Sequence, residues 1–157
     1  MRSVPATGTA PNRPLSDLCG AAAARIDRLQ SPFALIVRLY LAKVFFASGL
    51  TKIQDWSITL ALFRNEYHVP LLPPAVAAAL GTTAELALPV FIALGLGTRF
   101  AAVALFAFNI VAATSYPDLS DAGLKDHILW GALMLVLFVY GPGRLALDRR
   151  IGGDRSG

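Results

Sequence analysis

Ionisable side chains interrupt the long apolar stretches of this chain at Arg38, Lys43, Lys52 and Glu85. Charged groups in hydrocarbon are costly unless they are paired or hydrated, so those that occur there often mark proton routes or binding sites. Glu85, in the run Gly81-Thr-Thr-Ala-Glu-Leu-Ala-Leu-Pro89, is therefore the first candidate for a catalytic group, one that could carry a proton. The alternative is that Glu85 only holds helices together by pairing with a cation.

The spacing of the three cations limits which of them can pair with Glu85. Arg38, Phe45 and Lys52 follow one another at intervals of seven residues, which places them on one stripe of a helix. Lys43 lies about 140° around the helix from Arg38, so we expect Glu85 to pair with a cation on only one of these two faces. Near the middle of its stretch, Lys43 costs about 2.5 to 3.5 kcal/mol unless it has a partner or water. Arg38 and Lys52 can also extend toward the interfaces, and the partner of Glu85 stays open among the three.

Further polar groups lie in the later apolar stretches. Asn109 is either an interhelical hydrogen-bond donor or part of a site. His127 is the second candidate for a catalytic group, because it can titrate near neutrality and has Asp126 and Trp130 close by in sequence. The alternative is an interfacial histidine that faces lipid headgroups. The candidate pocket for a substrate or quinone comprises Arg38, Lys52, Glu85, Asn109, Asp126, His127 and Trp130.

Metal and cofactor motifs are sparse. Glu66 and His68 could meet Asp126 and His127, but the 2 histidines have no characteristic spacing, so we predict no metal site. Cys19 is the single cysteine, which excludes an internal disulfide or a CxxC redox pair. The sequence also lacks motifs for haem, iron–sulfur clusters and dinucleotides. We therefore expect no covalently bound cofactor, a quinone as the candidate carrier, and electrons supplied by a partner.

These residues must be positioned by four apolar stretches, at about 33–53, 74–96, 100–115 and 122–140. A bilayer core of about 30 Å needs about 20 apolar residues in a helix, and the stretches approach or exceed that length. The chain is 55% hydrophobic and 15% charged, whereas soluble domains are about 25% charged. A soluble domain of 157 residues could not surround four such segments. The sequence therefore predicts an all-α integral membrane protein with a four-helix transmembrane bundle.

The predicted layout has four parts. They are a disordered tail at 1–14, an interfacial helix or simple linker at 15–32, the transmembrane domain at 33–148, and a basic cytoplasmic tail at 149–157. No cleavable signal is expected, because charges continue through Arg25 and Arg28. In the 54–73 loop, Asp55 can cap a short periplasmic half-helix, with Trp56 and Tyr67 at the depth that interfacial aromatics favour.

The distribution of Lys and Arg predicts the orientation of the spans. If the spans alternate in direction, nine of these residues lie on the side of the termini and three on the opposite side. By the positive-inside rule both termini are cytoplasmic, in a multi-pass protein of the bacterial inner membrane. The net charge of +4 then reflects orientation and not binding to nucleic acid.

A set of motifs resembles the DoxX family of bacterial inner-membrane proteins over about residues 33–148. In order, they are Arg38, Phe45-Phe-Ala-Ser-Gly-Leu-Thr-Lys52, Leu62-Phe-Arg-Asn-Glu-Tyr67, Val69-Pro-Leu-Leu-Pro-Pro74, Glu85 with Pro89, Leu94-Gly-Leu-Gly-Thr-Arg99 and Gly141-Pro-Gly-Arg-Leu-Ala-Leu-Asp148. The resemblance implies a four-helix membrane bundle, and a family named for a subunit linked to thiosulfate:quinone oxidoreduction. Other members look like components of oxidative-stress or thiol-related assemblies, or accompany small secreted metal-stress peptides.

The family pattern is matched by position at Arg38, Gly49, Lys52 and Glu85. Lys43 departs from it, because the resemblance leads us to expect a bulky apolar residue there. The activity of most members is not established, so the resemblance transfers no catalytic residue to this chain.

Two functions from different classes follow. In the first, the protein is the membrane subunit of a quinone- or thiol-linked redox system or a stress-related system, an oxidoreductase subunit that needs a partner. In the second, it is a non-catalytic membrane anchor or assembly factor. A transporter is less favoured, because the spans show no inverted repeat. A cavity at Glu85 would favour the first function, and a bidentate contact between Arg38 and Glu85 would favour the second. We expect contact with the lipid bilayer, a protein partner or a homo-oligomer, and no nucleic acid.

Overall fold

The computed structural model describes residues 15–151, with the side chains of 15–19, 21–25 and 150 set aside. The predicted disordered tail at 1–14, the end of the predicted basic tail at 152–157 and the side chain of Cys19 therefore lie outside the described residues. Gln30 ends one compact unit and Ser31 begins a second, and the two are described separately.

Between residues 15 and 151 the chain forms six helices and no strand. They are α1 (Leu15–Gln54), α2 (Trp56–Asn65), α3 (Pro74–Leu94), α4 (Thr98–Ser115), α5 (Asp121–Tyr140) and α6 (Leu147–Ile151). Four segments are long and apolar enough to cross a membrane, namely Ile26–Gln54, Pro74–Leu94, Thr98–Ser115 and Asp121–Tyr140. The predicted fold class, an all-α membrane protein with four spanning helices, is confirmed.

Helix α1 covers both the predicted interfacial helix at 15–32 and the first span. Pro32 lies inside α1 and does not end it, although a proline in a helix removes one backbone hydrogen bond. The placement of residues 15–30 on a membrane surface stays a prediction.

The helix ends follow local sequence signals. Asp55 caps α2 by accepting a hydrogen bond from the Ile58 amide at 3.0 Å, as predicted, and Ser120 caps α5 through the Gly123 amide at 3.1 Å. Helix α3 ends at Leu94, two residues before the predicted end of that stretch, because Gly95 adopts a left-handed conformation with φ 71°. Glycine is the residue that adopts this conformation with least strain.

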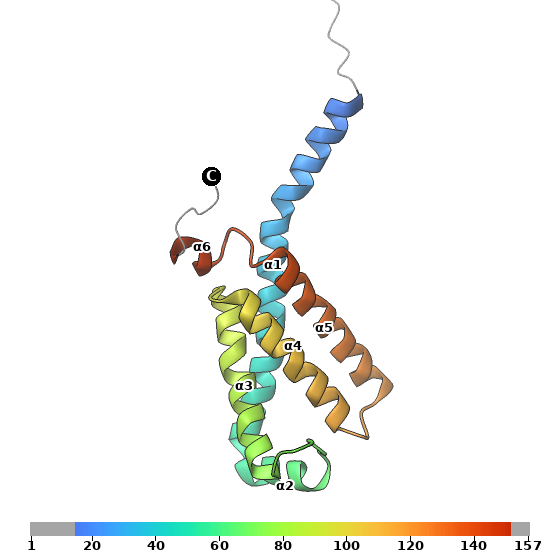
Figure 1. Ribbon diagram of the computed structural model, residues 1–157, viewed down its shortest axis with the longest axis vertical. Helices are drawn as coiled ribbons and strands as arrows, with labels where there is room; N and C mark the ends of the chain where they lie inside the picture. Colours follow the sequence, from blue (N-terminus) through green and yellow to red (C-terminus); the bar gives the residue numbers. More distant parts are fainter. Residues whose placement is uncertain (1–14, 152–157) are drawn as a thin grey trace, which may run out of the picture. The chain divides into compact units, whose positions relative to one another are not determined.

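Residues 31–151 pack around an apolar core, in which α4 lies against α3 and α5, and α2 lies against α3 (Figure 1). Leu41, Leu105 and Met134 are fully buried there, from three different helices. Helix α1 approaches α3 closely at Gly49, where an added Cβ would lie only 2.9 Å from the side chain of Leu86. This close approach brings the polar face of α1 against α3.

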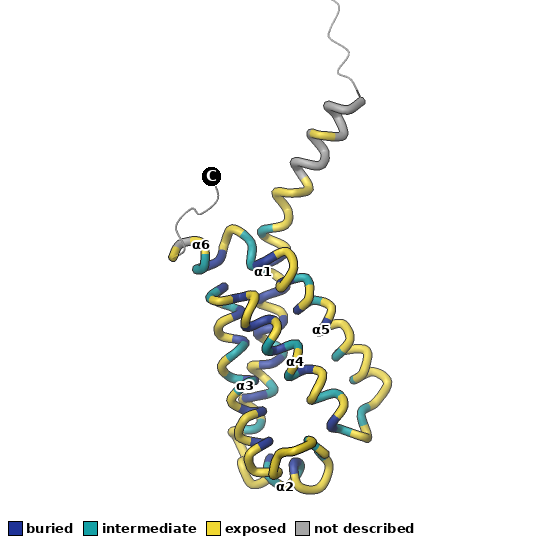
Figure 2. The backbone as a smooth tube through the Cα atoms, in the orientation of Figure 1, coloured by how far each residue is buried: buried dark blue, intermediate teal, exposed yellow. Residues whose placement is uncertain are grey.

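The outward faces of these helices are exposed, as the yellow segments of α3, α4 and α5 in Figure 2 show, and they carry many large apolar side chains. Ile36, Phe100 and Ile128, for example, expose 65%, 79% and 64% of their surface. Such a large apolar surface would be unfavourable in water. It follows that these faces contact the hydrocarbon of a lipid bilayer.

Candidate functional site

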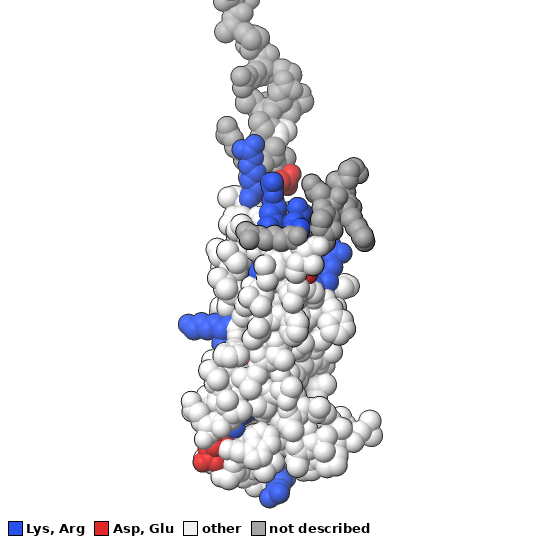
Figure 3. All heavy atoms as spheres, turned by 90° about the vertical axis from the view of Figure 1, so that its left-hand side faces the viewer, with Lys and Arg blue, Asp and Glu red and all other residues white. Residues whose placement is uncertain are grey.

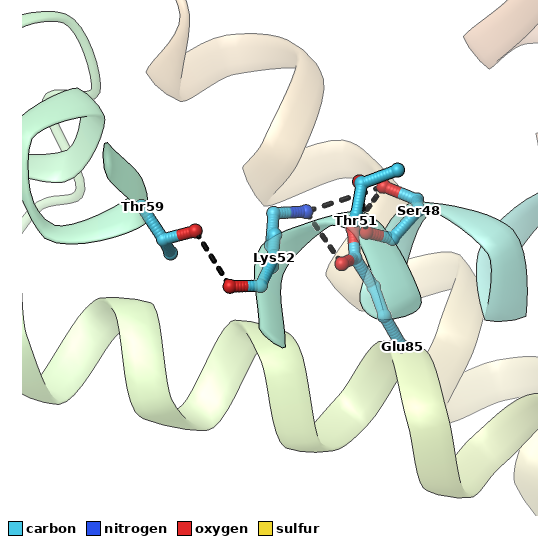
Figure 4. Close-up of polar contacts among 5 residues, drawn as sticks. All are labelled: Ser48, Thr51, Lys52, Thr59 and Glu85. Carbon is cyan, nitrogen blue, oxygen red and sulfur yellow. Dashed lines mark hydrogen bonds and ion pairs between the residues drawn. The ribbon is translucent and has the colours of Figure 1, made fainter. Parts of the chain in front are cut away.

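Glu85 of α3 pairs with Lys52 of α1, and Ser48 joins them (Figure 4). The Lys52 Nζ donates to Glu85 Oε2 at 2.5 Å, and the two side chains are 16% and 6% exposed. Ser48 lies one helical turn before Lys52, so its hydroxyl reaches both groups. It donates to Glu85 Oε1 at 3.1 Å and accepts from Lys52 Nζ at 3.2 Å. Both carboxylate oxygens of Glu85 therefore have a donor.

A further contact fixes the end of α1 that carries Lys52. The Thr59 hydroxyl of α2 donates to the Lys52 carbonyl oxygen at 2.8 Å. Thr59 is 3% exposed, so this contact is shielded from solvent. Lys52 is thus bound by α3 through its side chain and by α2 through its carbonyl oxygen.

A cavity of about 310 Å³ lies beside this pair and includes Lys52, Glu85 and Ser48 in its wall. Its other residues with polar atoms are Tyr67, Tyr116, His127 and Trp130, and most of the wall is apolar or aromatic. The aromatic lining residues are Phe45, Phe63, Tyr67, Phe108, Tyr116 and Trp130. An apolar cavity with few polar groups is typical of a small-molecule site.

Tyr67, in the loop after α2, lines this cavity, although it was not among the site residues predicted from the sequence. Its ring stacks between Phe63 and Tyr116, with centroid distances of 4.7 Å and 5.1 Å. Burial raises the pKa of the Tyr67 phenol above its ordinary value, and the nearby Glu85 carboxylate adds to the rise. The phenol therefore stays protonated at neutral pH and can donate a hydrogen bond.

Asn109 and His127 form a two-bond contact between α4 and α5. The Asn109 Nδ2 donates to the His127 carbonyl oxygen at 2.9 Å, which directs the amide oxygen toward the ring. His127 Nδ1 lies 2.7 Å from that amide oxygen, so Nδ1 must carry the proton. In the neutral ring Nε2 is then left as a hydrogen-bond acceptor.

Trp130 lies next to His127 and completes this wall. Its ring meets that of His127 edge-on, with centroids 5.0 Å apart, and meets Phe45 in the same way at 5.4 Å. The Trp130 indole N–H donates to the Tyr40 hydroxyl of α1 at 3.3 Å. These contacts connect α5 to α1 beside the cavity.

Arg38 belongs to a different part of the fold and does not contact Glu85. It is 1% exposed and donates to the carbonyl oxygens of Ile92 at 2.8 Å and Ala93 at 2.5 Å, at the end of α3. It also donates to the carbonyl oxygens of Pro142 and Leu145, each at 3.1 Å. Arg38 precedes Ser48 by roughly 15 Å of helix, which explains its absence from the cavity wall.

Two other residues considered from the sequence also lie away from the cavity. Asp126 and Lys43 are exposed and neither lines the cavity, because each lies on an outward face of its helix. Among the described residues, no group of three or more His, Cys, Asp and Glu side chains could hold a metal ion. Of the sequence-predicted set, the structure brings Lys52, Glu85, His127 and Trp130 to one cavity, with Asn109 behind His127.

Comparison with known proteins points to one family. The DoxX family model matches residues 33–117. A curated relative, an uncharacterised protein of Haemophilus influenzae, is 32% identical over 126 residues, which is 74% of this chain and 82% of the relative. No solved structure matches the chain. The family match ends before α5, so Asn109 and Glu85 fall within it and His127 does not.

Proposed function

Because the chain belongs to the DoxX family of membrane proteins, we propose that it is the membrane subunit of a redox system and binds a quinone head group in the cavity beside Glu85. The observation that carries this proposal is the Lys52–Glu85 pair in the wall of a largely apolar cavity that also has several aromatic lining residues. The aromatic walls suit a planar ring, and the volume of about 310 Å³ is at the lower end of small-molecule sites.

The chain contributes binding groups and proton transfer in this proposal. The Lys52 ammonium and the Tyr67 phenol are donors that can bind a carbonyl oxygen. Glu85 can accept or release a proton, and His127 offers Nε2 as a second acceptor. Reduction of a quinone to a quinol consumes electrons together with protons, and a partner protein supplies the electrons.

For the location we propose the bacterial inner membrane, with both termini in the cytoplasm and the cavity toward the periplasm. Arg99 lies at the first turn of α4, and Arg144 and Arg149 lie beyond the end of α5, all on the side of the termini, whereas Arg64 and Lys125 lie on the side of α2. On the face of the molecule that Figure 3 shows, the charged side chains gather mainly toward the two ends. The positive-inside rule favours the arginine-rich end as cytoplasmic.

Binding can be tested with the purified chain, because Trp130 lines the cavity. The chain has 2 tryptophans, so Trp56→Phe leaves Trp130 as the single tryptophan, which can be excited selectively. A short-chain ubiquinone should quench its fluorescence saturably in detergent. Lys52→Met should weaken binding about tenfold, because it removes a charge-assisted hydrogen bond of about 1.5 kcal/mol or more. Lys125→Met, which changes an exposed lysine on α5, is the matched control. Absence of saturable quenching by the unsubstituted chain contradicts the proposal.

Turnover separates binding from proton transfer. Glu85→Gln keeps a hydrogen-bonding side chain but cannot carry a proton. Its Kd for the quinone should therefore stay within about threefold of that of the unsubstituted chain, a smaller change than the loss of a charged hydrogen bond would cause. Quinone reduction by membranes that contain the chain and its co-purified partners should fall at least about a hundredfold, as for loss of a general acid–base. Equal turnover by both forms excludes Glu85 as an essential proton carrier.

The second candidate function is a non-catalytic anchor or assembly factor for a partner protein. Its support is that the Lys52–Glu85 pair joins α1 to α3 and would serve helix packing equally well. Under this alternative quinones do not bind, whereas loss of the pair still lowers the stability of the bundle.

A further inference from the structure

Lys43 is a second polar feature of the membrane-spanning region, independent of the proposed quinone cavity. It lies on the outward face of α1 and is exposed. Among the described side chains the one ion pair is Lys52–Glu85, so Lys43 has no acidic partner there.

The depth of Lys43 makes this isolation costly. At 1.5 Å per residue, Lys43 lies roughly 18 Å beyond Ser31 and roughly 16 Å before Gln54 along the helix. Both distances exceed the reach of a lysine side chain, so its ammonium cannot extend easily to either headgroup region. An unpaired ammonium at that depth costs about 2.5 to 3.5 kcal/mol on insertion scales.

The surface beside Lys43 is grooved and apolar. A shallow groove of about 370 Å³ runs between α1 and α3 beside it, with Ala42 and Phe46 on one side and Pro89 and Ala93 on the other. Small side chains such as alanine allow a neighbouring helix to approach closely in a membrane. The groove is otherwise apolar, so a carboxylate opposite Lys43 would be its main polar contact.

We propose that this groove binds a transmembrane helix of a different protein, one that carries an Asp or Glu at the depth of Lys43. Charge complementarity identifies the occupant, because a carboxylate in hydrocarbon has the same need for a counter-charge as the ammonium. A second copy of this chain cannot supply it from the described residues. Glu85 is buried and paired with Lys52, and every other described carboxylate lies outside the four spans or within two turns of the end of one.

A designed probe tests the proposal without knowledge of the natural partner. The probe is a polyleucine transmembrane peptide with one central Glu, and its matched form has Leu at that position. The full chain and the peptide carry a donor and an acceptor dye and are reconstituted at low density in phosphatidylcholine vesicles, which bear no net charge. Energy transfer should show about tenfold tighter association of the Glu peptide than of the Leu peptide.

Variants assign the effect to Lys43. Lys43→Leu should reduce binding of the Glu peptide to the level of the Leu peptide, and Lys43→Arg should retain it. Lys125→Leu, at an exposed lysine near the end of a span, should leave it unchanged. Equal binding of the two peptides by the unsubstituted chain overturns the proposal, and so does a Glu preference that survives Lys43→Leu. Association between two labelled copies of the chain that depends on Lys43 would also overturn it, in favour of a homo-oligomer.

Discussion

At the scale of single residues, Lys52 and Glu85 depend on each other because each would otherwise be a largely buried, unpaired charge. The Ser48 hydroxyl extends this pair to a third group, since it donates to the carboxylate and accepts from the ammonium. Removal of one charge therefore leaves the other with incomplete hydrogen bonding.

A double-mutant cycle measures this dependence. We expect Lys52→Met or Glu85→Gln alone to lower the free energy of unfolding by about 3 kcal/mol, the low end for breaking a buried pair. The double variant should lose less than the sum, with a coupling of about 1 to 3 kcal/mol. Reversible unfolding in detergent gives the three values, with Lys125→Met as the control. Additive losses would mean that the pair contributes nothing beyond its separate members.

Asn109 contacts His127 and does not line the cavity, and its amide fixes which ring nitrogen of His127 carries the proton. We predict that the neutral imidazole ring of His127 is the Nδ1–H tautomer in the unsubstituted chain and a mixture of both tautomers in Asn109→Leu. Nitrogen NMR of the chain labelled at histidine distinguishes the two forms, and His68→Gln assigns the second signal. The prediction fails if Asn109→Leu leaves the tautomer of His127 unchanged.

At the scale of elements, the junction between α3 and α4 is held by side chains from distant parts of the chain. Arg38 of α1 binds the carbonyl oxygens at the end of α3. Asp148, at the start of α6, accepts hydrogen bonds from the Gly97 and Thr98 amides at the start of α4, at 2.7 Å and 3.1 Å. A cation at a helix C-terminus and an anion at an N-terminus both complement the helix dipole.

Two glycines of this junction give a matched pair of substitutions. Both have positive φ, so Gly97→Ala should cost about 1 kcal/mol from backbone strain alone, since nothing lies within 4 Å of an added Cβ. Gly95→Ala adds a clash, because its Cβ would lie 2.6 Å from the Ala146 Cβ and 2.7 Å from Arg38 Nη2. We expect a loss of about 3 kcal/mol or more there, as overpacking adds about 1 to 3 kcal/mol. Equal losses in thermal unfolding would argue against close packing at Gly95.

At the scale of the whole molecule, the proposed orientation decides which compartment the cavity faces. In a Cys19→Ser background, single cysteines at Asn65 in α2 and Arg149 in α6 report the two ends, and both positions are exposed. An impermeant maleimide should label Asn65→Cys in intact spheroplasts, and Arg149→Cys only after the membrane is opened. The reverse labelling pattern would place the cavity toward the cytoplasm.

The sequence alone was sufficient for the fold class and the spans of this protein. Hydrocarbon selects apolar helices of a narrow range of lengths, so four such stretches predict four helices regardless of how these pack. The cap at Asp55 could also be predicted from the sequence, because capping depends on a few neighbouring residues. The second predicted stretch extends two residues past the end of α3, because a glycine in the left-handed conformation ends a helix without lowering the hydropathy of the sequence.

Only the tertiary structure decided which polar groups meet. Spacing placed Arg38 and Lys52 on one stripe of α1, but a stripe does not specify which neighbouring helix lies against which part of it. The close approach at Gly49 places Glu85 opposite Ser48 and Lys52, whereas Arg38 meets the end of α3. Tyr67 reaches the cavity through the folding of its loop, which hydropathy does not encode. Helix periodicity is a property of one segment, whereas a site between helices depends on the relative position and rotation of several, which their packing determines.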